Sequence, residues 1–349
     1  MSTRREFLAG SAALSVANRL VGSTEGSTRS NSTMRSYRLP HTDLEVSRIA
    51  YGCGLLVREE VSPDSLSTED IAQAARVVSV AHENGITLFD TAEAYGGGSS
   101  EAALGQVLAQ SRGLRHKVVI QTKCDGRQSR AGIRSSVEGS LRRLGTDYLD
   151  ILLLHSQQAL MEPQEVASVF EELKRSGKVR YFGVSNHTIG RIDLLKRFVR
   201  QPLVVNQIKL GLAQPGLLNE PSWFDGRLHN PPFAELAGVD YSRLNDMQVQ
   251  AYSPLKGKSF AGKTELLGPP TEASPELKEA ASKLHELATK KGTTPAAVAL
   301  AWLLRHPGRI LPIIGATRTE HILESCAADR IELSEEEWYA LFEAAPKDS

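Results

Sequence analysis

Short apolar runs alternate with helix-like patterns along most of the chain, and this alternation limits the possible folds more than any other feature. Helical patterns follow or separate these strand-like runs, as crossover helices separate the strands of a parallel sheet. The runs are apolar throughout, as strands buried on both faces are. The strand candidates cover 49–54, 86–90, 118–123, 151–155, 181–185, 203–208, 249–252 and 310–314. The pattern predicts an α/β protein with a (β/α)8 TIM barrel.

A dinucleotide-binding Rossmann domain is disfavoured because its glycine fingerprint is missing. No G-x-G-x-x-G follows the first strand, and Gly96-Gly97-Gly98 comes after the second strand with a different spacing. We expect an N-terminal hairpin around 40–43, where Tyr37 to Leu39 and Leu44 to Val46 flank a turn-like cluster. Gly211 to Asp246 forms a long loop between strands 6 and 7, typical of a lid or binding loop, although its prolines also fit a linker.

The composition gives no sign of a nucleic-acid or lipid partner. Lysine plus arginine equals aspartate plus glutamate at 41 each, so no net field favours an anionic surface, and a small-molecule partner is expected. Cys53, Cys124 and Cys326 are too scattered for a disulfide framework or a paired zinc site. They are interpreted as small core residues, and no metal is predicted. With no apolar seam in the pattern, a monomer is the default.

The N-terminus carries a different signal. Arg4-Arg5 precedes Phe7-Leu8 and a weakly apolar run, which resembles a bacterial twin-arginine export signal, although a frayed basic tail is the alternative. The run is too short and too polar for a permanent span of about 20 apolar residues. Residues 1–36 are therefore predicted to be signal and disordered spacer, and 37–349 the barrel. The signal predicts that the protein is exported to the periplasm or cell envelope. If the segment is instead a basic tail, a cytoplasmic location is expected.

Polar residues at the ends of adjacent predicted strands are the candidates for chemistry, because these ends converge on one face of a barrel. Asp90 and Tyr95 follow the second strand, Lys123 ends the third and His155 ends the fourth. Each alone has an ordinary structural explanation, but their coincidence on adjacent strands favours a site. An ammonium at Lys123 would lower the pKa of Tyr95, Asp90 would keep the lysine ionised, and His155 would orient a carbonyl oxygen. No nucleophile with its base is evident.

Several motifs together resemble the aldo-keto reductase superfamily from about Tyr37 to the C-terminus. They read LFDTAEAYGGGSSEAALG, VVIQTKC, LRRLGTDYLDILLLH, LKRSGKVRYFGVSN, VVNQIKL and VQAYSPL. The resemblance implies a (β/α)8 barrel that reduces carbonyls with NADPH, less often NADH, without metal. The family's Asp-Tyr-Lys-His tetrad matches Asp90, Tyr95, Lys123 and His155.

The resemblance also implies cofactor contacts. Ser185, Asn186 and Gln207 match positions that bind the nicotinamide carboxamide, Tyr252 matches the ring that stacks on it, and the remaining matches lie farther along the cofactor. Ser253 and Leu255 match positions that contact the pyrophosphate, and Glu324 and Ser325 match positions that contact the adenine. Many family members bind the 2′-phosphate with a lysine and an arginine, and these positions are occupied here by Gly315 and His321. Arg318 could bind the 2′-phosphate as a bidentate fork or be an ordinary surface arginine, so the choice between NADP(H) and NAD(H) stays open.

Two functions are compatible with these residues. The first is NAD(P)H-dependent reduction of aldehydes or ketones to alcohols, with the proton from Tyr95. The alternative is a nicotinamide-binding redox sensor or partner subunit with little turnover. Substrate choice is expected to depend on a set near the strand ends and in the long loop: Tyr51, Leu55, Leu56, Gln157, Trp223 and Phe224.

Overall fold

The computed structural model describes residues 34–58, 61–218, 222–224, 227–229, 238–255, 267, 269–275 and 277–346. The predicted export signal and most of its spacer lie outside the described residues. No helix in these ranges is both long enough and apolar enough to cross a membrane.

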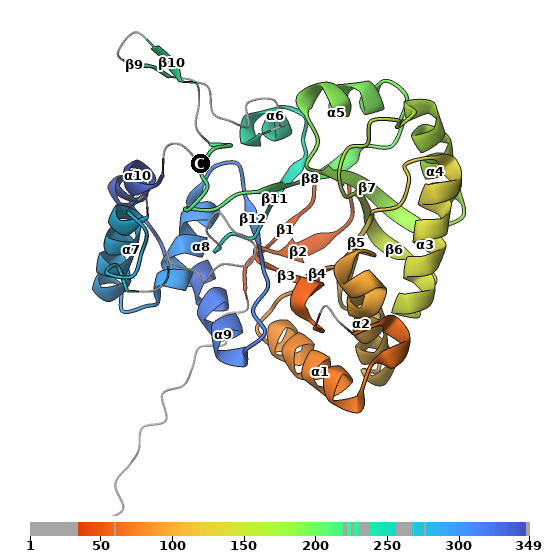
Figure 1. The fold of residues 1–349 in the computed structure, drawn as a ribbon, viewed down its shortest axis with the longest axis horizontal. Coiled ribbons are helices and arrows are strands. Elements are labelled where there is room, and N and C mark those ends of the chain that lie inside the picture. The colour runs from red at the N-terminus through yellow and green to blue at the C-terminus, as the bar shows by residue number, and fades with distance from the viewer. Residues whose placement is uncertain are drawn as a thin grey trace, which may run out of the picture. The chain divides into compact units, whose positions relative to one another are not determined.

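Eight parallel strands close into a barrel, in the order β3, β4, β5, β6, β7, β8, β11, β12 and back to β3 (Figure 1). The predicted (β/α)8 fold is therefore confirmed. The closing contact is short, because β12 and β3 pair through two residue pairs, Ile313 with Ala50 and Ile314 with Tyr51. The strands are β3 (Ala50–Gly52), β4 (Leu88–Asp90), β5 (Val119–Cys124), β6 (Leu149–Leu154), β7 (Val179–Ser185), β8 (Leu203–Lys209), β11 (Gln248–Tyr252) and β12 (Leu311–Ile314).

Helices surround the barrel strands, and their ends follow the sequence signals. The α1 helix begins with a capping box between Ser67 and Asp70, and α3 ends at Gly145, whose φ of 61° suits glycine. The helices are α1 (Thr68–Glu83), α2 (Ser99–Gln110), α3 (Arg130–Leu144), α4 (Pro163–Arg175), α5 (Ile189–Lys196), α6 (Val239–Leu244), α7 (Lys278–Lys290), α8 (Pro295–Arg305), α9 (Thr319–Ala327) and α10 (Glu335–Ala344). Short 3-10 helices are η1 (Cys53–Leu55), η2 (Pro63–Ser65), η3 (Tyr95–Gly98), η4 (Leu114–His116) and η5 (Ala328–Arg330).

The expected N-terminal hairpin is present and covers one end of the barrel. β1 (Ser36–Arg38) pairs antiparallel with β2 (Glu45–Ser47). Leu39, Leu44 and Val46 are buried and form one apolar cluster with strand residues inside the barrel. The amino-terminal ends of the strands are thus closed by packing, which leaves their carboxyl ends for chemistry.

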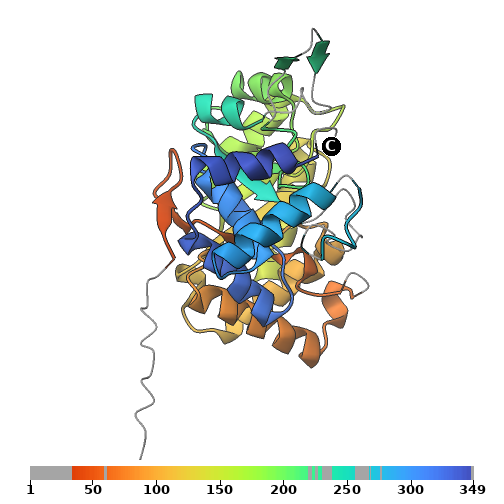
Figure 2. The same cartoon turned by 90° about the vertical axis from the view of Figure 1, so that its left-hand side faces the viewer.

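Three features were not predicted: a short hairpin, the helix α6 and the helix α10. The segment between β8 and β11, expected as a long loop, contains the hairpin of β9 (Ser222–Phe224) and β10 (Arg227–His229), and also α6. Six residues are too few to show helical periodicity in the sequence. The C-terminal α10 lies across α7 and α8 (Figure 2). Trp302 and Trp338 stack at 5.2 Å, and each indole N–H donates to the other residue's carbonyl.

Candidate active site

Asp90, Lys123 and Tyr95 come together at the carboxyl ends of β4 and β5. The ammonium of Lys123 donates to Asp90 Oδ2 at 2.7 Å, to the Thr91 carbonyl at 2.8 Å and to the Tyr95 hydroxyl at 3.1 Å. Lys123 is fully buried and Asp90 almost so. A buried charge is tolerated where it is paired and hydrogen-bonded, and here all three ammonium donors have acceptors.

Three consecutive glycines place Tyr95 over this ion pair. Gly96, Gly97 and Gly98 have φ values of 57°, 60° and 99°, a left-handed run that residues with a Cβ rarely adopt. The run lies within η3, leads the chain into α2 and leaves the phenol beside η1. A Cβ on Gly54 would lie 3.5 Å from the Tyr95 ring. Because Gly54 has no side chain, it does not cover this side of the ring.

The pKa of Tyr95 corrects one expectation. The sequence predicted that Lys123 would lower it, whereas the pKa is raised, because burial outweighs the lowering by the Lys123 ammonium. The hydroxyl therefore keeps its proton at neutral pH. Burial alone would lower the pKa of Lys123, but Asp90 and Tyr95 raise it above its usual value. This agrees with the prediction that Asp90 keeps the lysine ionised.

A fully buried network of amides holds the other oxygen of Asp90. Gln121 on β5 and Gln207 on β8 both donate to Asp90 Oδ1, at 2.6 and 3.0 Å. Both also donate to Gln250 Oε1 on β11, and Gln250 donates back to Gln121. The carboxylate is thus fixed by side chains from β5 and β8, and Gln250 on β11 holds those two glutamines in place. The predicted contact of Gln207 with a carboxamide stays a prediction.

His155 follows β6 and faces the phenol. Its ring lies edge-on to the Tyr95 ring, with centroids 6.0 Å apart at an angle of 85°. Its Nδ1 atom lies 2.5 Å from Asp125 Oδ1. The backbone N–H of His155 donates to Cys124 and its carbonyl accepts from Asn186, so both neighbouring strands fix its position.

Three of the four residues predicted to hold the nicotinamide, Ser185, Asn186 and Tyr252, lie at the ends of β7 and β11. Asn186 Nδ2 donates to Ser185 Oγ at 3.1 Å, and its Oδ1 accepts from the Tyr252 hydroxyl at 3.0 Å. Asn186 and Ser253 have φ values of 56° and 51°. Non-glycine residues rarely adopt this conformation, and such strain gathers at functional sites. Amide and hydroxyl groups beside a phenol ring fit an aromatic ring that bears an amide, as nicotinamide does.

The residues predicted to hold the rest of the cofactor are more dispersed. Arg318 is 67% exposed and pairs with Glu320, through Nε to Oε1 at 2.6 Å. Ser325 is buried, and its hydroxyl donates to the His321 carbonyl within α9. Gly315 is exposed, whereas Leu255 and Glu324 are half-buried. Their cofactor contacts stay predictions.

The structure narrows the residues expected to choose the substrate. Tyr51 is fully buried and its hydroxyl donates to the Ala316 carbonyl at 2.9 Å, so the expectation that it contacts substrate is corrected. Leu56 is also buried, whereas Leu55 is 44% exposed. Gln157 is exposed, and its Oε1 accepts from Thr188 at the start of α5. The side chains of Trp223 and Phe224 lie outside the described part of the chain.

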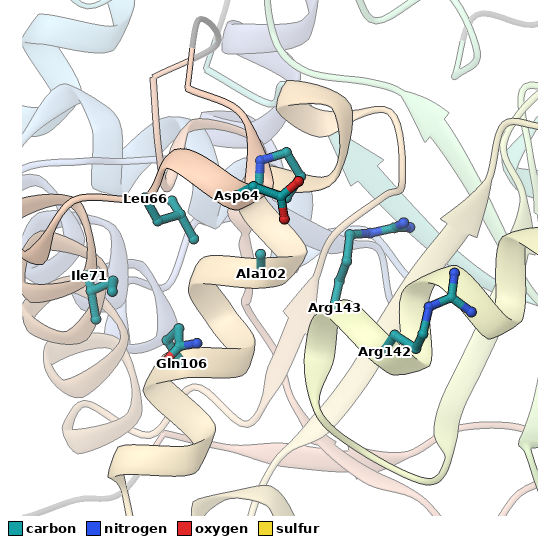
Figure 3. A pocket seen from close by; sticks show the side chains of 8 residues that line it. Asp64, Leu66, Ile71, Ala102, Gln106, Arg142 and Arg143 are labelled. Atoms are coloured by element: carbon teal, nitrogen blue, oxygen red, sulfur yellow. The ribbon is translucent and has the colours of Figure 1, made fainter.

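A buried ion pair supports the segment that carries Tyr95. Glu101 on α2 is fully buried, accepts from Thr122 Oγ1 at 2.6 Å and pairs with Arg143 at 2.7 Å. Arg143 also lines an outer hollow of about 550 Å³ between η2, α1, α2 and α3, shown with Asp64, Gln106 and Arg142 in Figure 3. This hollow contains no residue of the predicted tetrad. The Glu101–Arg143 pair therefore joins α2 and α3 to Thr122 on β5, next to Lys123.

We expect Glu101→Ala to lower the free energy of unfolding by about 3 kcal/mol, because Arg143 would lose its carboxylate in a mostly buried position. Urea unfolding followed by tryptophan fluorescence measures this change. Glu172→Ala is the matched control, since Glu172 pairs with Arg130 and Arg134 at the surface and should lose clearly less. Equal losses in the two variants would contradict the structural role of Glu101.

Sequence reasoning missed Asp125, Gln121 and Gln250. Asp125 is a polar residue two positions after the third predicted strand, a signal similar to the one that marked the other strand ends. The two glutamines lie inside apolar runs, where a polar residue in a buried strand was the available sign. Among the described residues, no group of three His, Cys, Asp or Glu side chains could hold a metal ion.

The closed barrel and its lysine-supported tyrosine define a (β/α)8-barrel oxidoreductase. The sequence profile of the aldo/keto reductase family matches residues 65–345, and the chain belongs to that family. It is 33% identical to the 6-dehydroglucose reductase of Agrobacterium fabrum over 318 residues, 86% of this chain and 95% of that protein. The oxidoreductase YdhF of Escherichia coli is 31% identical over 78% of this chain and 88% of its own length.

Two solved structures share the fold. A thermostable aldo-keto reductase, Tm1743, in complex with the inhibitor epalrestat superposes with a TM-score of 0.71 at 27% identity, covering 89% of this chain and 100% of that one. An aldo-keto reductase from Klebsiella pneumoniae in complex with NADPH gives 0.69 at 28% identity, covering 90% and 97%. The chain is thus an oxidoreductase of a family whose solved members include NADPH complexes.

Proposed function

We propose that this protein reduces an aldehyde or ketone to an alcohol, with Tyr95 as the proton donor. The observation that carries the proposal is the ammonium of Lys123, which lies 3.1 Å from the Tyr95 hydroxyl while Asp90 holds it at 2.7 Å. An acid that gives up a proton leaves a negative charge, and a fixed ammonium beside it stabilises that charge. This arrangement suits proton donation to an oxygen that becomes an alkoxide.

The chain's own residues account for the proton side of the reaction. Burial keeps the Tyr95 hydroxyl protonated until a substrate oxygen needs the proton, and Lys123 then stabilises the phenolate. Asp90 and the Thr91 carbonyl prevent the lysine from moving away. When bound, the nicotinamide would supply the hydride for the carbonyl carbon. The hydride and the proton together convert C=O to CH–OH.

NADP(H) is the proposed cofactor, supported by the Klebsiella relative that was solved with NADPH. Ser185, Asn186 and Tyr252 would hold the nicotinamide end, and Arg318 would meet a 2′-phosphate. Glu320 competes for the Arg318 guanidinium, so NAD(H) is the alternative cofactor.

We expect steady NADPH consumption with a panel of aromatic and short aliphatic aldehydes, because the acid and its ammonium are already assembled. The decrease in absorbance of the reduced nicotinamide measures turnover, and parallel assays with NADH test the cofactor. Cofactor binding without multiple turnovers would instead favour a redox sensor or partner subunit. No change in nicotinamide fluorescence on mixing would contradict both functions.

A further inference from the structure

Asp125 touches two parts of the candidate site at once. It follows β5, two residues after Lys123. Its Oδ2 accepts from the backbone N–H of Ala94, the neighbour of Tyr95, at 3.3 Å. Its Oδ1 lies 2.5 Å from Nδ1 of His155. One carboxylate therefore joins the segment that carries the acid to the imidazole that faces it.

A second carboxylate holds Asp125 in this position. Glu93 Oε1 accepts from the backbone N–H groups of Asp125 and Gly126 and from Ser136 Oγ, the last two at 2.6 and 2.7 Å. The loop after β4, which carries Glu93 and Ala94, and the loop after β5, which carries Asp125, are thus joined by two hydrogen bonds. The Asp125 N–H donates to Glu93, and the Ala94 N–H donates to the Asp125 carboxylate. Because the backbone of Asp125 is tied down, its carboxylate stays beside His155.

The short contact determines where the imidazole carries its proton. Nδ1 is buried and makes no hydrogen bond of normal geometry within the described residues. An unprotonated Nδ1 would place its lone pair against a carboxylate oxygen 2.5 Å away, which is repulsive. A proton on Nδ1 makes the same contact attractive. The carboxylate therefore favours Nδ1–H whether the ring is neutral or charged.

We propose that Asp125 is a positioning residue that keeps the proton of His155 on Nδ1 and so determines whether Nε2 accepts or donates a hydrogen bond toward the substrate. The proposal rests on the proposed carbonyl reduction. With Nδ1 protonated, the neutral ring presents a lone pair at Nε2, and the imidazolium alone presents an N–H. His155 can then donate to a carbonyl oxygen only as the imidazolium, whose Nδ1 atom lies against Asp125.

The surroundings of the imidazole are compatible with this control. Within the described residues its ring contacts two titratable side chains, Asp125 from the loop after β5 and Tyr95 from η3. The Lys123–Asp90 ion pair contacts Tyr95. From the end of β7 comes Asn186, a neutral amide that binds the His155 carbonyl. Asp125 is therefore the single anion in contact with the ring among these described groups.

Asp125→Asn tests the proposal, because the amide oxygen would keep the hydrogen bond from the Ala94 N–H, and the amide nitrogen would then donate to Nδ1 and move the ring proton to Nε2. The imidazole ¹⁵N resonances of His155, assigned by their loss in His155→Gln, report the tautomer at a pH where the ring is neutral. We expect Nδ1–H in the unmodified protein and Nε2–H in the variant.

Glu93→Gln is the matched control, because it disturbs the same loops without altering a group next to His155. It should leave the tautomer on Nδ1. The proposal is overturned by Nε2–H in the unmodified protein, by an unchanged tautomer in Asp125→Asn, or by an equal change in Glu93→Gln. The resonances need no turnover, so a tautomer change in a protein that reduces no carbonyl would refute the proposed function alone.

Discussion

Replacing Tyr95 with phenylalanine is expected to lower kcat for carbonyl reduction by about 10²–10⁴-fold, the range that general acid catalysis contributes. The variant keeps the ring that lies against His155 and removes the hydroxyl that Lys123 holds at 3.1 Å. Cofactor binding should persist, because the residues proposed to hold the nicotinamide end lie on β7 and β11. Steady-state kinetics and titration of nicotinamide fluorescence measure the two effects separately.

Tyr252→Phe is the matched control for this experiment. It also removes a phenolic hydroxyl at the carboxyl end of the barrel, but that hydroxyl donates to Asn186 and not to the ion pair. We expect a modest change in cofactor affinity and much smaller loss of kcat. Full activity in Tyr95→Phe would refute the role of Tyr95 as the acid.

The second large effect is expected for Lys123→Met, which should abolish most turnover and lower the free energy of unfolding by about 3–5 kcal/mol. The activity falls because the Tyr95 phenolate loses its ammonium. The stability falls because the Asp90 carboxylate stays buried without its counter-ion, although Gln121 and Gln207 still donate to it. Urea unfolding and aldehyde reduction measured on the same preparation give both numbers.

A double variant separates the two consequences. Asp90→Asn combined with Lys123→Met removes both charges, so much of the stability should return while activity stays low. A Lys123→Met protein as stable as the unmodified one would contradict the buried ion pair. An active double variant would contradict the proposed support of the acid.

The fold could be predicted where local chemistry alone decides it. The starts of α4 and α8 can be recognised in the sequence because proline begins each helix, and Gly177, with a φ of 75°, marks the end of α4. The α6 helix was missed because its six residues show no period. The outward direction of Tyr51, toward the helical layer, was also missed, since the register of β3 against its neighbours decides which face a residue occupies.

The positions of the catalytic candidates could be predicted from the sequence, but their interactions could not. Polar residues at strand ends pointed to Asp90, Lys123 and His155, because a barrel brings those ends together whatever its exact register. The net pKa of Tyr95 was not predictable, since it depends on how deeply the phenol is buried. The amides around Asp90 come from β5, β8 and β11, and their meeting inside the barrel depends on strand stagger. The export signal remains a prediction.

The short seam between β12 and β3 has a consequence for how the chain folds. The first barrel strand and the last lie almost a full domain apart in sequence, yet they must pair before the sheet has no free edge. During synthesis, one edge of β3 therefore stays unpaired until the ribosome has released the segment that contains Leu311–Ile314. Such distant pairing makes folding slow, so a truncation before β12 should yield an aggregation-prone chain rather than a smaller stable domain.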